Sequence, residues 1–193
     1  MPKRRVKRIA WEVESERLVI TATMERRIKS GVIRRSIESL AKFSQLTSQE
    51  DLFYDLPVAT FAAMNLERYD EAGDLARAAI ESAKTFDQNW NYGNGLHAGH
   101  TVLGLLALRD GNLSRALEEL RASGNVPKSP QLGSFGPSMQ LARELLLQGH
   151  SVEVIEFLDQ CRSFWTHGGL WLDVWRRKIN SGRVPNFFHH RYR

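Results

Sequence analysis

The sequence predicts an all-α protein. Through most of the chain after residue 32, apolar residues recur every three or four positions, which is the spacing of one helix face. Glycines close the successive helical patterns, and no pair of alternating segments resembles a β-hairpin. The 193 residues are 42% hydrophobic and 25% charged, which is ordinary for a single globular domain with a buried core.

The helices are expected in a regular series. The first has an apolar stripe that begins at Val32, after Gly31 stops the preceding pattern. The second begins at Ser48, which stands three residues before Asp51 as in a capping box, and it must accommodate Pro57 or break there. Further helices are expected over residues 70–85, 92–109, 113–122, 138–148, 151–165 and 170–181.

Both ends of the chain are basic. The first ten residues hold five Lys or Arg and no acid, and the residues from Leu170 onward hold six against one, so residues 11–169 sum to −5 within a total of +5. A block of like charges cannot fold on itself. We therefore expect a basic, partly disordered extension over residues 1–31, a helical domain over 32–182 and a basic aromatic tail over 183–193. Within the extension, residues 11–31 could form a short helix or an irregular segment.

Several classes of protein are excluded. No run reaches the roughly 18 to 20 apolar residues of a membrane span, and acidic residues directly after the basic start leave no signal peptide. Cys161 is the single cysteine, which excludes an intrachain disulfide, and its spacing from Phe157 and Leu158 predicts a buried thiol. A cytoplasmic protein without membrane contact is expected.

Three turns in the helical region can be superposed on one another: residues 67–72, 111–116 and 149–154. Each turn ends in a small residue, and another small residue stands twelve positions before that one. Small residues at both places let two antiparallel helices approach closely. The pairs are Thr60 with Ala72, Gly104 with Ala116, and Ala142 with Val154.

This signature resembles the tetratricopeptide repeat (TPR), over about residues 52–165. The resemblance implies antiparallel helix pairs stacked as a short right-handed superhelix with a C-terminal capping helix. The repeat spacings of 44 and 38 residues exceed the roughly 34 of an undisturbed TPR. Extra residues must therefore lie between the pairs, in segments 86–95 and 124–137.

The resemblance extends to particular sequence segments. A group of uncharacterised bacterial TPR-like proteins has segments similar to residues 91–100, 103–104, 129–139 and 161–165, and also to Trp171, Trp175, Ile179, Gly182, Pro185 and Phe187. This similarity supports the fold and implies no biochemical activity.

One helix face in the middle of the chain is unusually polar. Asn94, His97 and Thr101 follow helical spacing beside small residues, and His100 comes three positions after His97. The segment 129–137 could pack against this face. We expect the following residues to line or support a groove or pocket: Asn91, Asn94, His97, His100, Gln131, Ser134 and Phe135.

Besides recognition of a partner chain in the groove, the two histidines have three interpretations. They could bind a metal ion, but no carboxylate or thiolate stands in register to complete the site. They could act in catalysis, with Ser134 opposite His97 through the loop. In the third interpretation, which we favour, they hydrogen-bond carbonyls of the loop and hold it against the helix pair. We therefore predict no catalytic residue, no metal site and no cofactor.

Aromatic and basic residues form two further groups. The aromatics after residue 163, which include Trp171 and Trp175, are expected to cap the end of the helical stack, with self-association as the alternative. The cations of the two ends could bind phosphates.

Three functions follow. We first expect a protein-interaction scaffold that binds a peptide or partner protein in a TPR-like groove. The second hypothesis is a small-molecule sensor or enzyme that uses Asn94, His97 and His100. The third is a nucleic-acid-associated factor that uses the basic ends.

Overall fold

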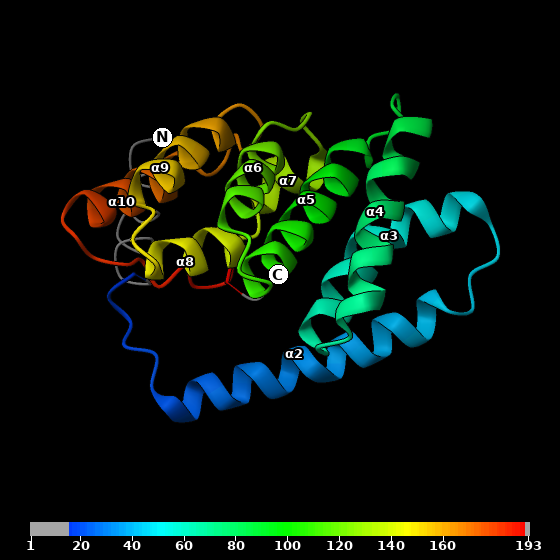
Figure 1. Ribbon diagram of the computed structural model, residues 1–193, viewed down its shortest axis with the longest axis horizontal. Coiled ribbons are helices and arrows are strands. Elements are labelled where there is room, and N and C mark those ends of the chain that lie inside the picture. Colours follow the sequence, from blue (N-terminus) through cyan, green and yellow to red (C-terminus); the bar gives the residue numbers. More distant parts are fainter. Residues whose placement is uncertain (1–15, 192–193) are drawn as a thin grey trace, which may run out of the picture.

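The computed structural model describes residues 16–191, and over this range the chain is helical with no strand (Figure 1). The predicted all-α class is therefore confirmed. The expected basic arm of residues 1–10, together with Tyr192 and Arg193, lies outside the described residues. The helices are α2 (Ala22–Phe43), α3 (Gln49–Asn65), α4 (Tyr69–Thr85), α5 (Tyr92–Arg109), α6 (Leu113–Gly124), α7 (Pro130–Phe135), α8 (Gln140–Leu147), α9 (Ser151–Cys161) and α10 (Gly169–Asn180).

The three superposable turns join α3 to α4, α5 to α6 and α8 to α9, and the two helices of each pair pack together. Each turn contains one residue with a positive φ: Glu67 at 58°, Gly111 at 76° and Gly149 at 92°. In each, the next residue donates its N–H to the carbonyl five positions earlier, at 2.8 to 3.0 Å. This is the hydrogen bond of a Schellman turn. The repeat seen in the sequence is thus a repeat of backbone geometry.

Helix α5 lies at the centre of the fold and packs against α3, α4, α6, α7 and α8. The small residues predicted to allow close approach lie at these contacts. A Cβ atom on Gly104 would come within 2.3 Å of Leu141 Cδ2 on α8, and one on Gly99 within 2.7 Å of the Ala76 carbonyl oxygen on α4. Glycine is therefore required for α5 to approach its neighbours.

Helix α2 corrects the expected start of the domain. It begins at Ala22, ten residues before the predicted start, and passes through Gly31 without a break. The Thr21 hydroxyl accepts a hydrogen bond from Met24 N–H and caps the first turn. A glycine inside a helix costs only about 1 kcal/mol. Capping and the packing of α2 on α3 outweigh that cost.

The stripe of α2 is narrower than the sequence suggests. Val32, Ser36 and Leu40 are buried, whereas Ile33 and Ile37 remain 45% and 55% exposed. The buried residues are four apart and form a single line along the helix. These three are the buried residues of α2.

The segment between α6 and α8 is not a plain loop. Ser129 caps a short helix, α7, by accepting a hydrogen bond from Leu132 N–H. Helix α8 begins at Gln140, two residues later than expected. Pro57 lies inside an unbroken α3.

The C-terminal aromatics form a buried cluster that covers the end of the helical stack. Helix α10 packs on α9, and Trp165, Trp171 and Trp175 are buried with Phe187. These aromatics are buried, as the prediction of a cap requires. The expected separate tail over residues 183–193 is wrong for its described part, because Phe187 and His190 are buried against the tryptophans. Cys161 is a buried thiol in the same core cluster, as predicted.

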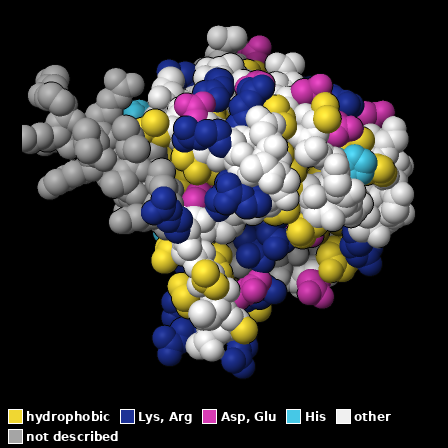
Figure 2. All heavy atoms as spheres, turned by 90° about the vertical axis from the view of Figure 1, so that its left-hand side faces the viewer, with side chains coloured by type: hydrophobic (Ala, Val, Ile, Leu, Met, Phe, Trp, Pro, Cys, Tyr) yellow, Lys and Arg dark blue, Asp and Glu magenta, His cyan; other side chains and the backbone are white. Residues whose placement is uncertain are grey.

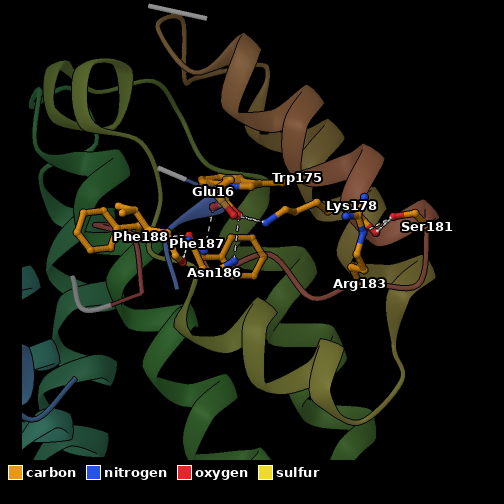
Figure 3. Close-up of polar contacts among 9 residues, drawn as sticks. Glu16, Trp175, Lys178, Ser181, Arg183, Asn186, Phe187 and Phe188 are labelled. Atoms are coloured by element: carbon orange, nitrogen blue, oxygen red, sulfur yellow. Dashed lines mark hydrogen bonds and ion pairs between the residues drawn. The ribbon is translucent and has the colours of Figure 1, made fainter. Parts of the chain in front are cut away.

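One buried carboxylate joins the N-terminal segment to the C-terminal end (Figure 3). Glu16 Oε1 accepts hydrogen bonds from Trp175 Nε1 at 2.8 Å and from the Phe187 backbone N–H at 3.1 Å. Its Oε2 accepts from Lys178 Nζ at 2.8 Å and from the Asn186 N–H at 3.0 Å. A buried carboxylate with four donors has its hydrogen-bonding needs met.

We predict that Gly99→Ala destabilises the protein by about 1–3 kcal/mol, because the new methyl group meets the Ala76 carbonyl in a packed helix contact. Gly31→Ala is the matched control, since a Cβ there meets only the end of the flexible Arg35 side chain at 3.5 Å. That variant is expected to gain up to about 1 kcal/mol from helix propensity. Denaturant unfolding measures both, and a stabilised Gly99→Ala variant would contradict the close packing of α5.

We also predict that Glu16→Gln lowers the free energy of unfolding by about 2–3 kcal/mol, because Lys178 loses its buried partner. Glu156→Gln is the control. Its carboxylate is exposed and 4.0 Å from Arg121, so a change within about 0.5 kcal/mol is expected. Equal unfolding midpoints for the two variants would show that the Glu16 contacts contribute nothing.

Candidate functional site

A groove lies where α2, α3, α5 and α7 meet, with a cavity volume of about 440 Å³. The extra segments predicted between the helix pairs both contribute to its wall, through Trp90 and Asn91 from the first and Gln131, Leu132 and Phe135 from the second. The remaining lining residues are Val32, Arg35, Ser36 and Ser39 of α2; Tyr54, Pro57, Val58, Phe61, Ala62 and Asn65 of α3; Asn94, His97 and Ala98 of α5; and Gly136 and Ser138 after α7.

Asn91 compensates for the proline in α3. Proline at position 57 has no N–H, so the carbonyl of Phe53 loses its helical hydrogen-bond partner. The Asn91 Nδ2 group donates to that carbonyl at 3.0 Å. Asn91 is itself buried, and its side chain therefore ties the start of α5 to the middle of α3.

Asn94 joins α5 to α7. Its Nδ2 donates to Asn91 Oδ1 at 2.7 Å and to Gln131 Oε1 at 3.1 Å, and its Oδ1 accepts from the Ser129 hydroxyl at 2.5 Å. Ser129 is also the residue that caps α7. The amide of Asn94 thus fixes the position at which α7 begins.

His97 holds both ends of the segment that contains α7. The Ser138 backbone N–H donates to His97 Nε2 at 2.9 Å, so Nε2 carries no proton. Nδ1 lies 2.9 Å from the Ser123 carbonyl oxygen and must be the nitrogen that donates. The imidazole is therefore neutral, protonated at Nδ1 and hydrogen-bonded at both nitrogens. The favoured interpretation of His97, as a support for the loop, is confirmed.

The environment of His97 lowers its pKa to about 4 from the ordinary 6.5. Burial is the largest cause, because a charged imidazole loses its hydration there. The hydrogen bond to Ser123 opposes the shift, and the nearby His100 adds to it. A neutral histidine with both nitrogens occupied has no free site for a proton or a metal ion.

His100 faces elsewhere and does not line the groove. Its Nδ1 lies 2.7 Å from Glu119 Oε2 on α6, and Arg115 Nη2 pairs with the other oxygen of Glu119 at 2.5 Å. The expectation that His100 bonds a loop carbonyl is wrong. Glu119 is also the carboxylate that sequence reasoning missed, although it stands three residues after Ala116 and so on the same helix face.

Ser134 and Phe135 of α7 line different hollows. Phe135 is 58% exposed and lines the groove. Ser134 is exposed beside Lys128, Thr166 and His167, in a separate hollow. The proposed approach of Ser134 to His97 is therefore not observed. Of the seven predicted residues, the structure brings together Asn91, Asn94, His97, Gln131 and Phe135.

The groove is mainly apolar and has an exposed apolar rim. Val58 and Trp90 are 55% and 46% exposed, and the Trp90 ring stacks on Tyr54 with centroids 5.2 Å apart. Arg35 is the one charged residue among the described lining residues. Helix α2 also forms part of this wall. No sequence motif predicted that, because the motifs placed the groove on α5 and the segment 129–137 alone.

In residues 16–191, no three His, Cys, Asp or Glu side chains are grouped so that they could hold a metal ion. No helix in that range has the length and apolar composition needed to cross a bilayer. Comparisons of the chain with models of protein families, with curated proteins and with solved structures find no match.

We predict that His97 makes stability depend on pH. The unfolded chain binds a proton at His97 near pH 6.5 and the folded protein only near pH 4. Between these values the unfolded state binds more protons, so stability falls as the pH falls, by about 3 kcal/mol across the window. Denaturant unfolding from pH 7 to pH 4 should show a steeper loss for the wild type than for His97→Gln. Parallel curves would contradict the buried neutral imidazole.

Proposed function

We propose that the protein is an interaction module that receives a peptide segment of a partner protein in the groove between α2, α3, α5 and α7. The observation that carries the proposal is the apolar groove with its exposed rim of Val58, Trp90 and Phe135. Exposed apolar side chains gathered around a hollow are typical of a recognition surface.

The polar groups of the groove support recognition better than catalysis. His97 uses both ring nitrogens within the protein, and His100 lies away from the groove. Asn94 is engaged at both ends of its amide, whereas the exposed Gln131 keeps its amide nitrogen at the wall, where it can bond a peptide backbone. The anchors of a bound segment would be apolar side chains, and the Gln131 amide would set its direction.

The arrangement of helix pairs agrees with this proposal. We infer that α3/α4, α5/α6 and α8/α9 form a short TPR-like stack, with the first helix of each pair toward the groove side. Contacts of α5 with both α3 and α8 support this order. Proteins built from stacked helix pairs use such surfaces to bind extended or helical peptides.

A small molecule is the second candidate, and the cavity volume of about 440 Å³ favours it. That volume falls inside the range of roughly 300–1,000 Å³ found for small-molecule sites. A thermal-shift screen of metabolites against the full chain tests this candidate separately.

We predict that the full chain selects peptides with aromatic and aliphatic residues from a random display library. Val58→Arg places a charge on the rim and should weaken binding of the selected peptides at least tenfold. Val152→Arg is the matched control, because Val152 is exposed on α9 and does not line the groove. It should bind as the wild type does.

Two results would contradict the proposal. One is a selection that enriches no peptide over the unselected library. The other is equal binding by the Val58→Arg variant and the wild type, which would place any peptide site outside the groove.

A further inference from the structure

Helix α2 carries arginines that have no acidic partner among the described residues. Its 22 residues contain six Lys or Arg and two acids. Lys29 pairs with Glu25 and Lys42 with Asp55, at 3.7 and 2.6 Å. The other four are exposed and have no acidic partner among the described residues: Arg26, Arg27, Arg34 and Arg35.

Other helices differ in this respect. On α4, α5, α6 and α8, every Lys and Arg lies within 4.0 Å of a carboxylate. Elsewhere in residues 16–191, cations without such a partner occur singly, at Arg17, Lys128, Arg177 and Arg183. The concentration of unpaired cations on α2 is therefore specific to that helix.

Three of these arginines, Arg26, Arg27 and Arg34, lie outside the groove, whereas Arg35 lines it. The buried residues of α2 are Val32, Ser36 and Leu40, and the helix packs on α3. It runs along one edge of the molecule, with no other helix on its outer side (Figure 1). Figure 2 views the molecule toward the N-terminal end of α2 and shows Lys and Arg side chains gathered around its lower part. No acid stands between Arg26 and Arg35, and Glu38 follows them three residues later, so this part of α2 keeps a net positive charge.

The spacing of the arginines fits a polyanion with two rows of charge. Arg26 and Arg27 form one pair and Arg34 and Arg35 another, eight residues farther along. At 1.5 Å per residue the two pairs lie about 12 Å apart along the helix axis. The major groove of B-form DNA is about 12 Å wide, with a row of phosphates along each edge. Guanidinium groups match phosphate oxygens through paired hydrogen bonds.

We propose that the outer face of α2 binds the phosphate backbone of double-stranded DNA, with Arg26 and Arg27 at one edge of the major groove and Arg34 at the other. The outer face has no aromatic side chain to stack on a base, so binding is independent of sequence. A membrane surface fits less well, because an interfacial helix must bury an apolar face. The buried apolar residues of α2 are packed on α3, and its exposed large apolar residues, Met24, Ile33 and Ile37, are too few to form such a face.

The test measures fluorescence anisotropy of a labelled 20-base-pair duplex with the full chain at several salt concentrations. The variant is Arg26→Gln with Arg27→Gln and Arg34→Gln; Arg35 is kept because it lines the groove. The matched control is Arg68→Gln with Arg77→Gln and Lys84→Gln, three cations that are paired with acids. Both variants lose the same charge, and both keep the five cations of the first ten residues.

The α2 variant should bind DNA at least tenfold more weakly, and its slope of log affinity against log salt should fall by about 2 to 3, as expected for three lost phosphate contacts. The control should stay within about twofold of the wild type. Equal weakening in both variants would overturn the proposal in favour of net charge alone. Absence of duplex binding would also overturn it, as would binding of anionic vesicles through α2 without binding of DNA.

Discussion

The fold depends on how closely α5 approaches its neighbours. Glycines at positions 99 and 104 remove the side chains that would separate it from α4 and α8. Close packing leaves His97 without water, and an imidazole in such a place must have its hydrogen bonds supplied by the protein. His97 obtains them from Ser123 and Ser138, the two ends of the segment that contains α7. The same bonds therefore place α7 as a wall of the groove.

Much of this fold could be predicted because its signals are local. Glycines at helix ends and turn residues determine short stretches of backbone, and small residues at fixed spacing determine the helix contacts beside them. The start of α2 could not be predicted in the same way. Gly31 is a breaker by propensity, and its effect is outweighed by a cap at Thr21 and by packing on α3, which depends on residues far away in the chain.

The candidate site shows a similar division. Helical spacing puts Asn91, Asn94 and His97 on one side of α5, and the groove contains all three. His100 is rotated by about 60° from His97 on the helix, and the position of α6 then decides that it meets Glu119. Charge was harder still to interpret. The net charge of residues 11–169 is negative and conceals the basic α2, in which four of the six cations have no acidic partner among the described residues, whereas every cation of α4, α5, α6 and α8 has one.

The most direct test of this account is the protonation of the His97 ring. Long-range ¹H–¹⁵N correlation spectra of labelled protein distinguish the two neutral tautomers and the imidazolium. The account predicts a neutral ring at pH 6 with its proton on Nδ1, since Nε2 accepts from the Ser138 N–H. A proton on Nε2, or a charged ring at pH 6, would contradict it, because the segment that carries α7 would then lack the bond that holds it against α5.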